Sequence, residues 1–254
     1  MSLQNNMKSC GFNILAIAIV LFFVNCGRSS GEIDGPIAPT DRVISFSGMD
    51  WIVRTTSNKT AGPGPNLFSD SDKNVWLDTE GRLHLKIRQE GGQWYCAGIT
   101  AKKSMGYGKY VFYIGSDINQ LDRNVVAGLF TYLNDEEEID IEFSKWSVAE
   151  NQNAQFASQP SEIVGNKKRF DIAPDLGQTV HSFDWQEQHI AFQSSYKSSL
   201  GADVVLQDWI YKGRHVPKAK NEKLKLNLWL FKGQMPTDFK DQTIVIDSVR
   251  FVKQ

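Results

Sequence analysis

From Val43 onward, hydrophobic and polar residues alternate in short runs, and no long stretch shows helical spacing. The run from Arg82 to Arg88 alternates at every residue, which is the period of a β-strand with one buried face. Further runs are rich in β-branched and aromatic residues and predict strands at 107–114, 125–133, 138–143, 189–192, 224–231 and 243–252. Because no helical crossovers separate them, we expect an all-β fold of antiparallel sheets, a sandwich or a barrel.

This pattern continues to the end of the chain without a repeat or a low-complexity block. The chain has 254 residues, of which 41% are hydrophobic, so it can bury a large core. A β-sandwich often reaches roughly 200–250 residues as one domain. The sequence therefore predicts a single domain over residues 43–254.

The N-terminus predicts export. Residues 1–8 are polar and include Lys8, and residues 10–24 are almost wholly apolar. A cationic start before a short apolar run is the layout of a secretory signal peptide, and the run is too short to span a membrane comfortably. The alternative within this segment is an uncleaved anchor.

The apolar run ends at Phe23-Val24-Asn25-Cys26, which resembles the lipobox of bacterial lipoproteins, although Phe23 and Asn25 depart from its commonest form. The resemblance implies that a signal peptide of residues 1–25 is removed and that Cys26 is lipidated. Residues 26–42 are rich in Gly, Ser, Pro and charge and predict a flexible tether. We expect a lipoprotein of the cell envelope bound to a membrane through its N-terminal lipid, with plain secretion as the alternative.

Charge and cysteine content exclude other classes. The formal net charge is −1, and nucleic-acid binding needs a surplus of Lys and Arg, so no nucleic-acid partner is expected. After cleavage and lipidation, Cys96 has no cysteine partner, which excludes a disulfide framework and favours a small buried hydrophobic role. No His or Cys cluster has zinc-ligand spacing.

The stretch from Glu138 to Phe143 carries the candidate chemistry. In a strand, Glu138, Asp140 and Glu142 share one face while the alternate residues enter the core. One interpretation is a solvated outer face. The other is catalysis. The outer Cα atoms lie about 13 Å apart at roughly 3.3 Å per residue, and two Glu side chains that reach toward each other on a curved sheet can bring their carboxyls to about 5–6 Å, close to the roughly 5–5.5 Å of retaining glycosidases.

This acidic strand resembles the active-site signature of glycoside hydrolase family 16, in the unbulged form of bacterial lichenases. The resemblance covers most of residues 43–254 and includes several landmarks in the family's order: Cys96-Ala97-Gly98, Tyr107-Gly108-Lys109-Tyr110, Val126–Tyr132, His181–Trp185, Leu226-Asn227-Leu228-Trp229 and Asp247–Phe251. The resemblance implies a concanavalin A-like β-jelly roll, that is, a two-sheet antiparallel β-sandwich with a concave glycan cleft. The implied activity is hydrolysis of internal β-glycosidic bonds in a β-glucan-like polysaccharide, with retention of configuration.

Residue by residue, the resemblance implies Glu138 as nucleophile, Glu142 as general acid and base, and Asp140 as the residue that assists the nucleophile. Alternation on 224–231 places the leucines inward and the polar and aromatic residues on the opposite face. Sugar contacts are expected from a set of aromatic and amide side chains: Phe130, Tyr132, Trp146, Asn227 and Trp229. For the aromatic residues, burial in the core is the competing interpretation. Trp185 is expected to be structural.

Departures from the family limit what the resemblance implies. Lichenases carry Glu and Arg where this chain has Gly98 and Thr100, and Asn where it has Ala157, so their substrate specificity is not expected here. No cofactor is required. The resemblance also implies a structural calcium, bound through Asp247 and a backbone carbonyl at Gly81, and further oxygens would have to come from backbone and water.

Three alternatives to a hydrolase remain open: a non-catalytic glycan-binding protein of the same fold, a transglycosylase, and a structural envelope lipoprotein. The complete Glu/Asp/Glu triplet favours an enzyme, because a binding module does not need it. The expected partners are a polysaccharide and a membrane, and we expect a monomer.

Overall fold

The structure, a computed structural model, describes residues 41–253. The predicted signal peptide, the predicted lipidation site Cys26 and the predicted tether up to residue 40 lie outside the described residues. The first strand begins at Val43. Arg42, the last residue of the predicted tether, already contacts the domain, because its guanidinium donates to the carbonyls of Asp70 and Val75 at 2.7 and 2.9 Å.

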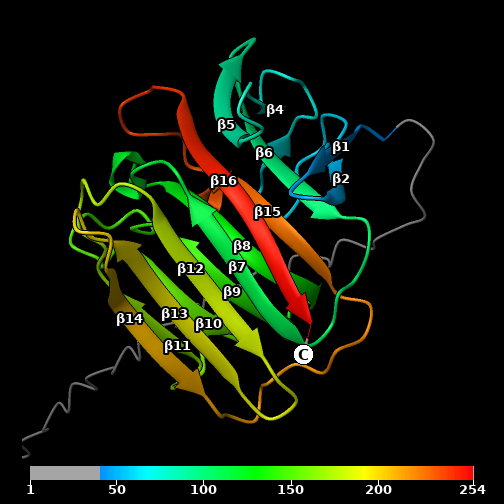
Figure 1. Cartoon of the computed structure of the whole chain (residues 1–254). Helices are drawn as coiled ribbons and strands as arrows, with labels where there is room; N and C mark the ends of the chain where they lie inside the picture. Colours follow the sequence, from blue (N-terminus) through cyan, green and yellow to red (C-terminus); the bar gives the residue numbers. More distant parts are fainter. Residues whose placement is uncertain (1–40, 254) are drawn as a thin grey trace, which may run out of the picture.

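The strands form two layers (Figure 1). We call the first the carboxylate layer; in spatial order it contains β11 (Lys167–Phe170), β10 (Ala154–Ser158), β9 (Glu137–Phe143), β8 (Val125–Asn134), β15 (Lys223–Leu230), β6 (Gln93–Ala101), β2 (Met49–Val53) and β1 (Val43–Phe46). The back layer contains β4 (Val75–Leu77), β5 (Leu83–Glu90), β16 (Gln242–Lys253), β7 (Gly108–Ile114), β12 (Thr179–Trp185), β13 (Ile190–Lys197) and β14 (Asp203–Tyr211).

Pairing between β5 and β6 joins the two layers along one edge. Within the described part of the chain these strands pair antiparallel, except that the short β3 (Leu67–Phe68) runs parallel to β6. Helical structure there is limited to two 3₁₀ turns, η1 (Ile118–Gln120) and η2 (Phe231–Gly233). The prediction of an all-β, antiparallel two-sheet jelly roll is confirmed.

Strict alternation builds the core between the layers. On β15, the side chains of Leu224, Leu226, Leu228 and Leu230 are at most 2% exposed and point inward, as the sequence predicts. The back layer supplies large aromatic side chains to the same core: Phe112, Phe183 and Phe192. Full burial of each such side chain contributes about 1.5–3 kcal/mol, so the pattern fixes which face of every strand is turned outward.

Three polar or reactive side chains have structural roles in this core. Trp185 is buried and its indole donates to the Pro217 carbonyl at 3.0 Å. Cys96 is a free, fully buried thiol, and burial raises its pKa to about 12. His181 is buried between two hydroxyl groups, and burial lowers its pKa to about 3, so it is neutral. The predictions for Cys96 and Trp185 are confirmed.

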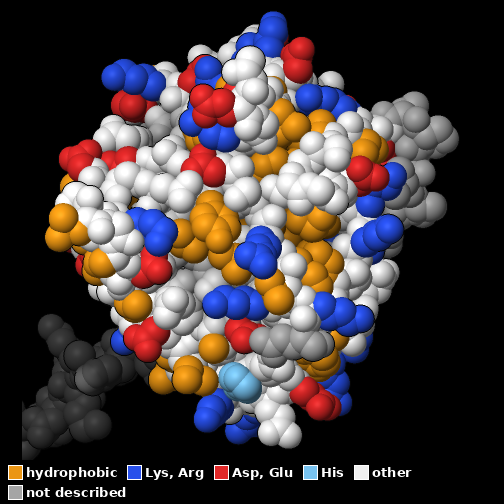
Figure 2. Space-filling view, viewed as in Figure 1, with side chains coloured by type: hydrophobic (Ala, Val, Ile, Leu, Met, Phe, Trp, Pro, Cys, Tyr) orange, Lys and Arg blue, Asp and Glu red, His pale blue; other side chains and the backbone are white. Residues whose placement is uncertain are grey.

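The outer face of the back layer mixes side chains of all kinds. In the view that has β16, β7, β12 and β13 in front, hydrophobic side chains are scattered among basic and acidic ones (Figure 2). Exposed apolar residues of this layer lie on two strands: Val205 and Ile210 on β14, and Val252 on β16. The candidate carboxylates lie on β9, in the other layer.

Candidate active site

Strand register groups the candidate residues into three parallel rows. Side chains directly opposite each other on antiparallel strands point to the same side of a sheet. The rows, read across the strands, are Glu138, Tyr132 and Lys223; then Lys167, Ala157, Asp140, Phe130, Lys225 and Thr100; then Arg169, Gln155, Glu142, Gly128, Asn227 and Gly98. We call this side of the layer, opposite the core, the carboxylate face.

Polar side chains at the centre of the carboxylate face are buried. Asp140, Asn227 and Lys225 point away from the core, yet they are only 3%, 2% and 4% exposed. Glu138 and Glu142 are half-buried. Surrounding side chains therefore shield this polar row from bulk water, which strengthens electrostatic interactions within it.

Burial and mutual repulsion make the three carboxyls hold protons more tightly. The pKa of Glu138 lies well above its ordinary value because of burial, and then because of the charge and hydrogen bond of Asp140. Burial, followed by the charge of Glu142, raises the pKa of Asp140 to about 8. Two carboxyls that interact in this way titrate as a pair.

Glu142 is tuned by a separate set of neighbours. Burial raises its pKa, and a hydrogen bond from Gln155, together with the charges of Arg169 and Lys167, partly counteracts this. Gln155 Nε2 donates to Glu142 Oε2 at 2.7 Å, and Arg169 Nε donates to Gln155 Oε1 at 3.2 Å. This chain of two hydrogen bonds orients Glu142 and links its proton affinity to a fixed cation.

Asp140 has its own amide partner. Gln159 Nε2 donates to Asp140 Oδ2 at 2.8 Å. The backbone N–H of Gln159 donates to the Glu138 carbonyl at 3.1 Å, which extends the pairing of β10 with β9 by one residue. Asp140 is thus held between Gln159 and Glu138, where it can pass a proton to Glu138 or withdraw one.

Asn227 presents an amide that the protein leaves unsatisfied. Both its Nδ2 and its Oδ1 are buried without a hydrogen-bond partner. It lies between Gly98 and Gly128 in the Glu142 row, and a side chain at Gly98 would collide with Asn227 Oδ1. A buried orphan amide costs about 1–3 kcal/mol, so this side chain fits a ligand hydroxyl.

The predicted aromatic contacts flank the carboxylates. Tyr132 lies opposite Glu138 and Phe130 opposite Asp140. Trp229 follows Asn227 by two residues on β15 and so shares its face, with the indole Nε1 near Gly128. Trp146 lies just beyond β9 with a positive φ of 47°, and the Arg169 guanidinium stacks 4.1 Å from its ring centre.

Pairing therefore brings together all predicted catalytic and sugar-binding residues except Trp146, which reaches the face through its contact with Arg169. Their functional roles stay predictions. Sequence reasoning missed four polar side chains of the same face: Gln155, Gln159, Arg169 and Lys225. The sequence does show which residues within β10, β11 or β15 share a face, because alternate side chains point to the same side. It does not show that this is the face of the carboxylates until the register with β9 is known.

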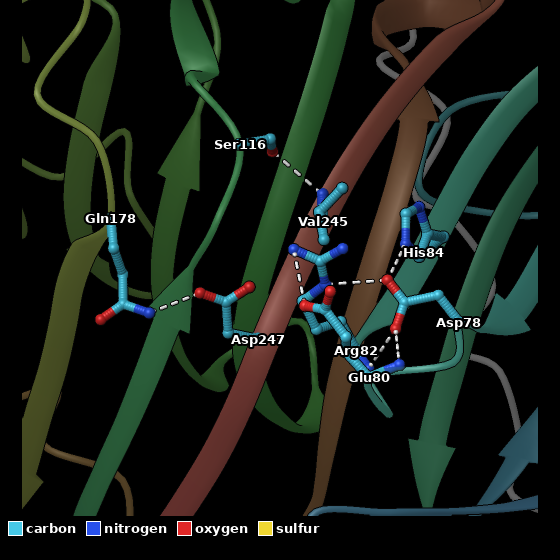
Figure 3. Close-up of polar contacts among 8 residues, drawn as sticks. All are labelled: Asp78, Glu80, Arg82, His84, Ser116, Gln178, Val245 and Asp247. Carbon is cyan, nitrogen blue, oxygen red and sulfur yellow. Dashed lines mark hydrogen bonds and ion pairs between the residues drawn. The ribbon is translucent and has the colours of Figure 1, made fainter.

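The predicted calcium ligands lie in the back layer. Gly81 is in the turn before β5, and Leu83 pairs with Ile246, the neighbour of Asp247. Asp247 Oδ2 accepts from Gln178, while its Oδ1 is buried without a partner against Gly115 (Figure 3). This orphan oxygen fits one ligand of a cation.

The rest of a calcium ligand set is not provided by side chains. Within residues 41–253, no group of three or more His, Cys, Asp or Glu is arranged to hold a metal. Next to Gly81, Arg82 bonds to Asp78 at 2.8 Å and to Glu80 at 3.4 Å, and its charge also acts on Asp247 (Figure 3). Calcium here would require backbone and water oxygens and would compete with the Arg82 charge.

Comparisons with known proteins relate the chain to β-glucanases at the level of fold. No protein-family model matches it, and no curated protein matches it. Among solved structures, Bacillus licheniformis β-glucanase aligns with a TM-score of 0.60 and 17% identity, covering 90% of this chain and 100% of the glucanase. A β-1,3-1,4-glucanase (lichenase) from a mouse hindgut metagenome aligns at 0.57 and 20% identity, covering 84% and 98%.

A β-1,3-glucanase from Mycobacterium marinum aligns at a TM-score of 0.56 and 19% identity, covering 86% of this chain and 100% of that one. The fold is thus the jelly roll of β-glucanases, a glycoside hydrolase fold. In the described residues, no helix has the length and apolar character needed to cross a membrane.

Proposed function

We propose that this protein is a retaining glycoside hydrolase of family 16 that cleaves internal β-linkages of a polysaccharide at the cell envelope. The observation that carries the proposal is that Glu138, Asp140 and Glu142 share one face of β9, where burial raises the pKa of each carboxyl. The glycosidase fold and the orphan amide of Asn227 support it.

In the first step, Glu142 donates its proton to the glycosidic oxygen while the Glu138 carboxylate attacks the anomeric carbon. The C–O bond to the leaving sugar breaks, and a covalent glycosyl–enzyme ester forms. The raised pKa of Glu142 suits a group that must begin protonated near neutral pH. Glu138 must be ionised to attack, so the proton that it shares with Asp140 has to move to Asp140 when substrate binds, although in the free protein their hydrogen bond raises the pKa of Glu138 and lowers that of Asp140.

In the second step, Glu142 is a carboxylate and removes a proton from an incoming water molecule. The oxygen of this water attacks the anomeric carbon, and the ester bond to Glu138 breaks. Two inversions restore the original configuration. Throughout, Gln155 keeps Glu142 oriented, and Asn227 provides a hydrogen-bonding amide beside the reaction centre.

The proposed location rests on the N-terminal sequence, where a signal-like apolar run ends at Cys26. An envelope lipoprotein would act on polysaccharide that reaches the cell surface. Stable anchoring of this type needs more than one acyl chain.

The direct test is release of reducing ends from a panel of β-glucans and galactans. We expect cleavage of at least one polymer by the wild-type protein and none above background by Glu138→Gln. Glu187→Gln, a matched change at an exposed carboxylate in the β12–β13 turn, should retain activity. Binding of polymers without any release would instead indicate a non-catalytic glycan-binding protein.

A further inference from the structure

Basic side chains flank the carboxylates on both sides of the carboxylate face. Lys225 lies in the Asp140 row on β15, two strands from β9, and Lys167 ends the same row on β11, two strands away in the other direction. At a strand spacing of about 4.8 Å, each is roughly 10 Å from the carboxylate strand. Arg169 and Lys223 end the two neighbouring rows.

Lys225 is held in place on the carboxylate face. It is 4% exposed, and its ammonium lies 4.6 Å from the centre of the Tyr132 ring, within the range of a cation–π interaction. Arg169 is likewise fixed, by its stacking on Trp146 and its hydrogen bond to Gln155. Cations fixed in this way lose little side-chain entropy when they bind a ligand.

Positive charge lies close to the carboxylates. Lys225, Lys223, Lys167 and Arg169 lie on strands two away from β9, and the acids that act on one another there are Glu138, Asp140, Glu142 and Asp135. Because the pKa of each of the three β9 carboxyls is raised, a proton held by any of them leaves this face with more positive than negative charge. The whole chain, by contrast, has a net charge of −1 and an isoelectric point near 6.4.

Small side chains lie beside two of the cations. Ala157 is next to Lys167 in its row, and Thr100 is next to Lys225. No bulky side chain in the row therefore adjoins either cation on that side.

From these observations we infer that the polysaccharide bound by this face is anionic, bearing sulfate esters or uronic-acid carboxylates that contact Lys225 on one side of the cleavage point and Lys167 and Arg169 on the other. The inference rests on the proposed function for the position of the cleavage point. It needs only binding for its test.

The experiment uses one glucan backbone with and without charge. Binding of the mature Glu142→Gln variant to laminarin, sulfated laminarin and C6-oxidised laminarin is measured by calorimetry between about 20 and about 500 mM NaCl, a range over which salt screens surface charges. We expect at least one anionic polymer to bind about tenfold or more tightly than laminarin at low salt, the preference shrinking as salt rises. The two anionic polymers distinguish sulfate from carboxylate recognition.

Three substitutions assign the effect to the face. Lys225→Met and Lys167→Met should each remove most of the anionic preference, and Lys167 is exposed, so its loss does not endanger folding. Lys109→Met, on the outer face of β7, should leave the preference intact. Equal affinity for charged and neutral laminarin, or a preference that survives both face substitutions, would overturn the inference.

The proposed function and the anionic-substrate inference can be rejected independently of each other. Cleavage of neutral glucans without an anionic preference would support the hydrolase and reject the anionic substrate. An anionic preference that is lost in Lys225→Met, without cleavage of any polymer by the wild-type protein, would support anionic binding and reject the hydrolase.

Discussion

Replacing Gln155 by methionine should raise the pH at which the enzyme loses activity. Gln155 is 4% exposed and donates to Glu142 Oε2 at 2.7 Å, and this bond lowers the pKa of Glu142. A hydrogen bond is stronger to the charged carboxylate than to the neutral acid. Removing the donor therefore favours the protonated form, and the acid stays competent to higher pH.

The size of the effect follows from the bond type. A hydrogen bond to a charged group contributes about 1.5–3 kcal/mol, and about 1.36 kcal/mol corresponds to one pH unit. Gln155 is buried and Glu142 is half-buried, so solvent weakens this contribution only in part. The basic limb of the kcat/KM profile, which reports the acid of the free enzyme, should move upward by about one unit or more.

The assay is the kcat/KM profile between about pH 4 and pH 10 on a polymer cleaved in the reducing-end panel. Gln193→Met, at an exposed glutamine on β13, is the matched control and should leave the profile unchanged. Thermal unfolding of both variants checks that the fold is intact. A basic limb that stays in place or moves downward in Gln155→Met would refute the assignment of Glu142 as the acid.

Three further predictions concern stability, metal and processing. Asp140 has a folded pKa of about 8 against an ordinary value of 3.8, so the folded state binds the extra proton and stability falls as pH rises between these values. Asp140→Asn should therefore unfold at a higher temperature than wild type at pH 8, by a stabilisation of about 1–3 kcal/mol, with a smaller gain at pH 4; an unchanged Tm at pH 8 would contradict this. Calcium at about 100 times its Kd should stabilise the protein by about 2.7 kcal/mol over EDTA, and Asp247→Asn should lose this gain, whereas equal Tm values in calcium and EDTA would exclude the site. Intact-mass analysis of membrane-extracted protein should show an N-terminus at a lipid-modified Cys26, and an unmodified Cys26 would refute the lipoprotein.

Sequence pattern predicted the strands that have one buried and one open face. β5 and β15 alternate clearly, and each lies within two residues of its predicted range. β10 was not predicted because all five of its residues are buried, so hydrophobic and polar positions do not alternate along it. β11 was not predicted because three of its four residues are cationic, a composition that does not indicate a strand.

The same contrast applies to the site. Parity within one strand was enough to place Glu138, Asp140 and Glu142 on a common face. Gln155 and Lys225 reach that face from β10 and β15, through pairings whose register depends on the connecting loops and the packed core. Local pattern cannot specify a register between strands this far apart in the sequence, so the hydrogen bond to Glu142 and the cation beside Tyr132 emerge only from the fold.

The most direct test of the central claim is proton NMR of the first-formed product when the wild-type protein cleaves a β-linked polysaccharide. Nucleophilic attack by Glu138 followed by hydrolysis gives two inversions, so the β-anomer should appear first and mutarotate to the α-anomer afterwards. An α-anomer as the first product would show a single displacement and would contradict the roles assigned to Glu138 and Glu142.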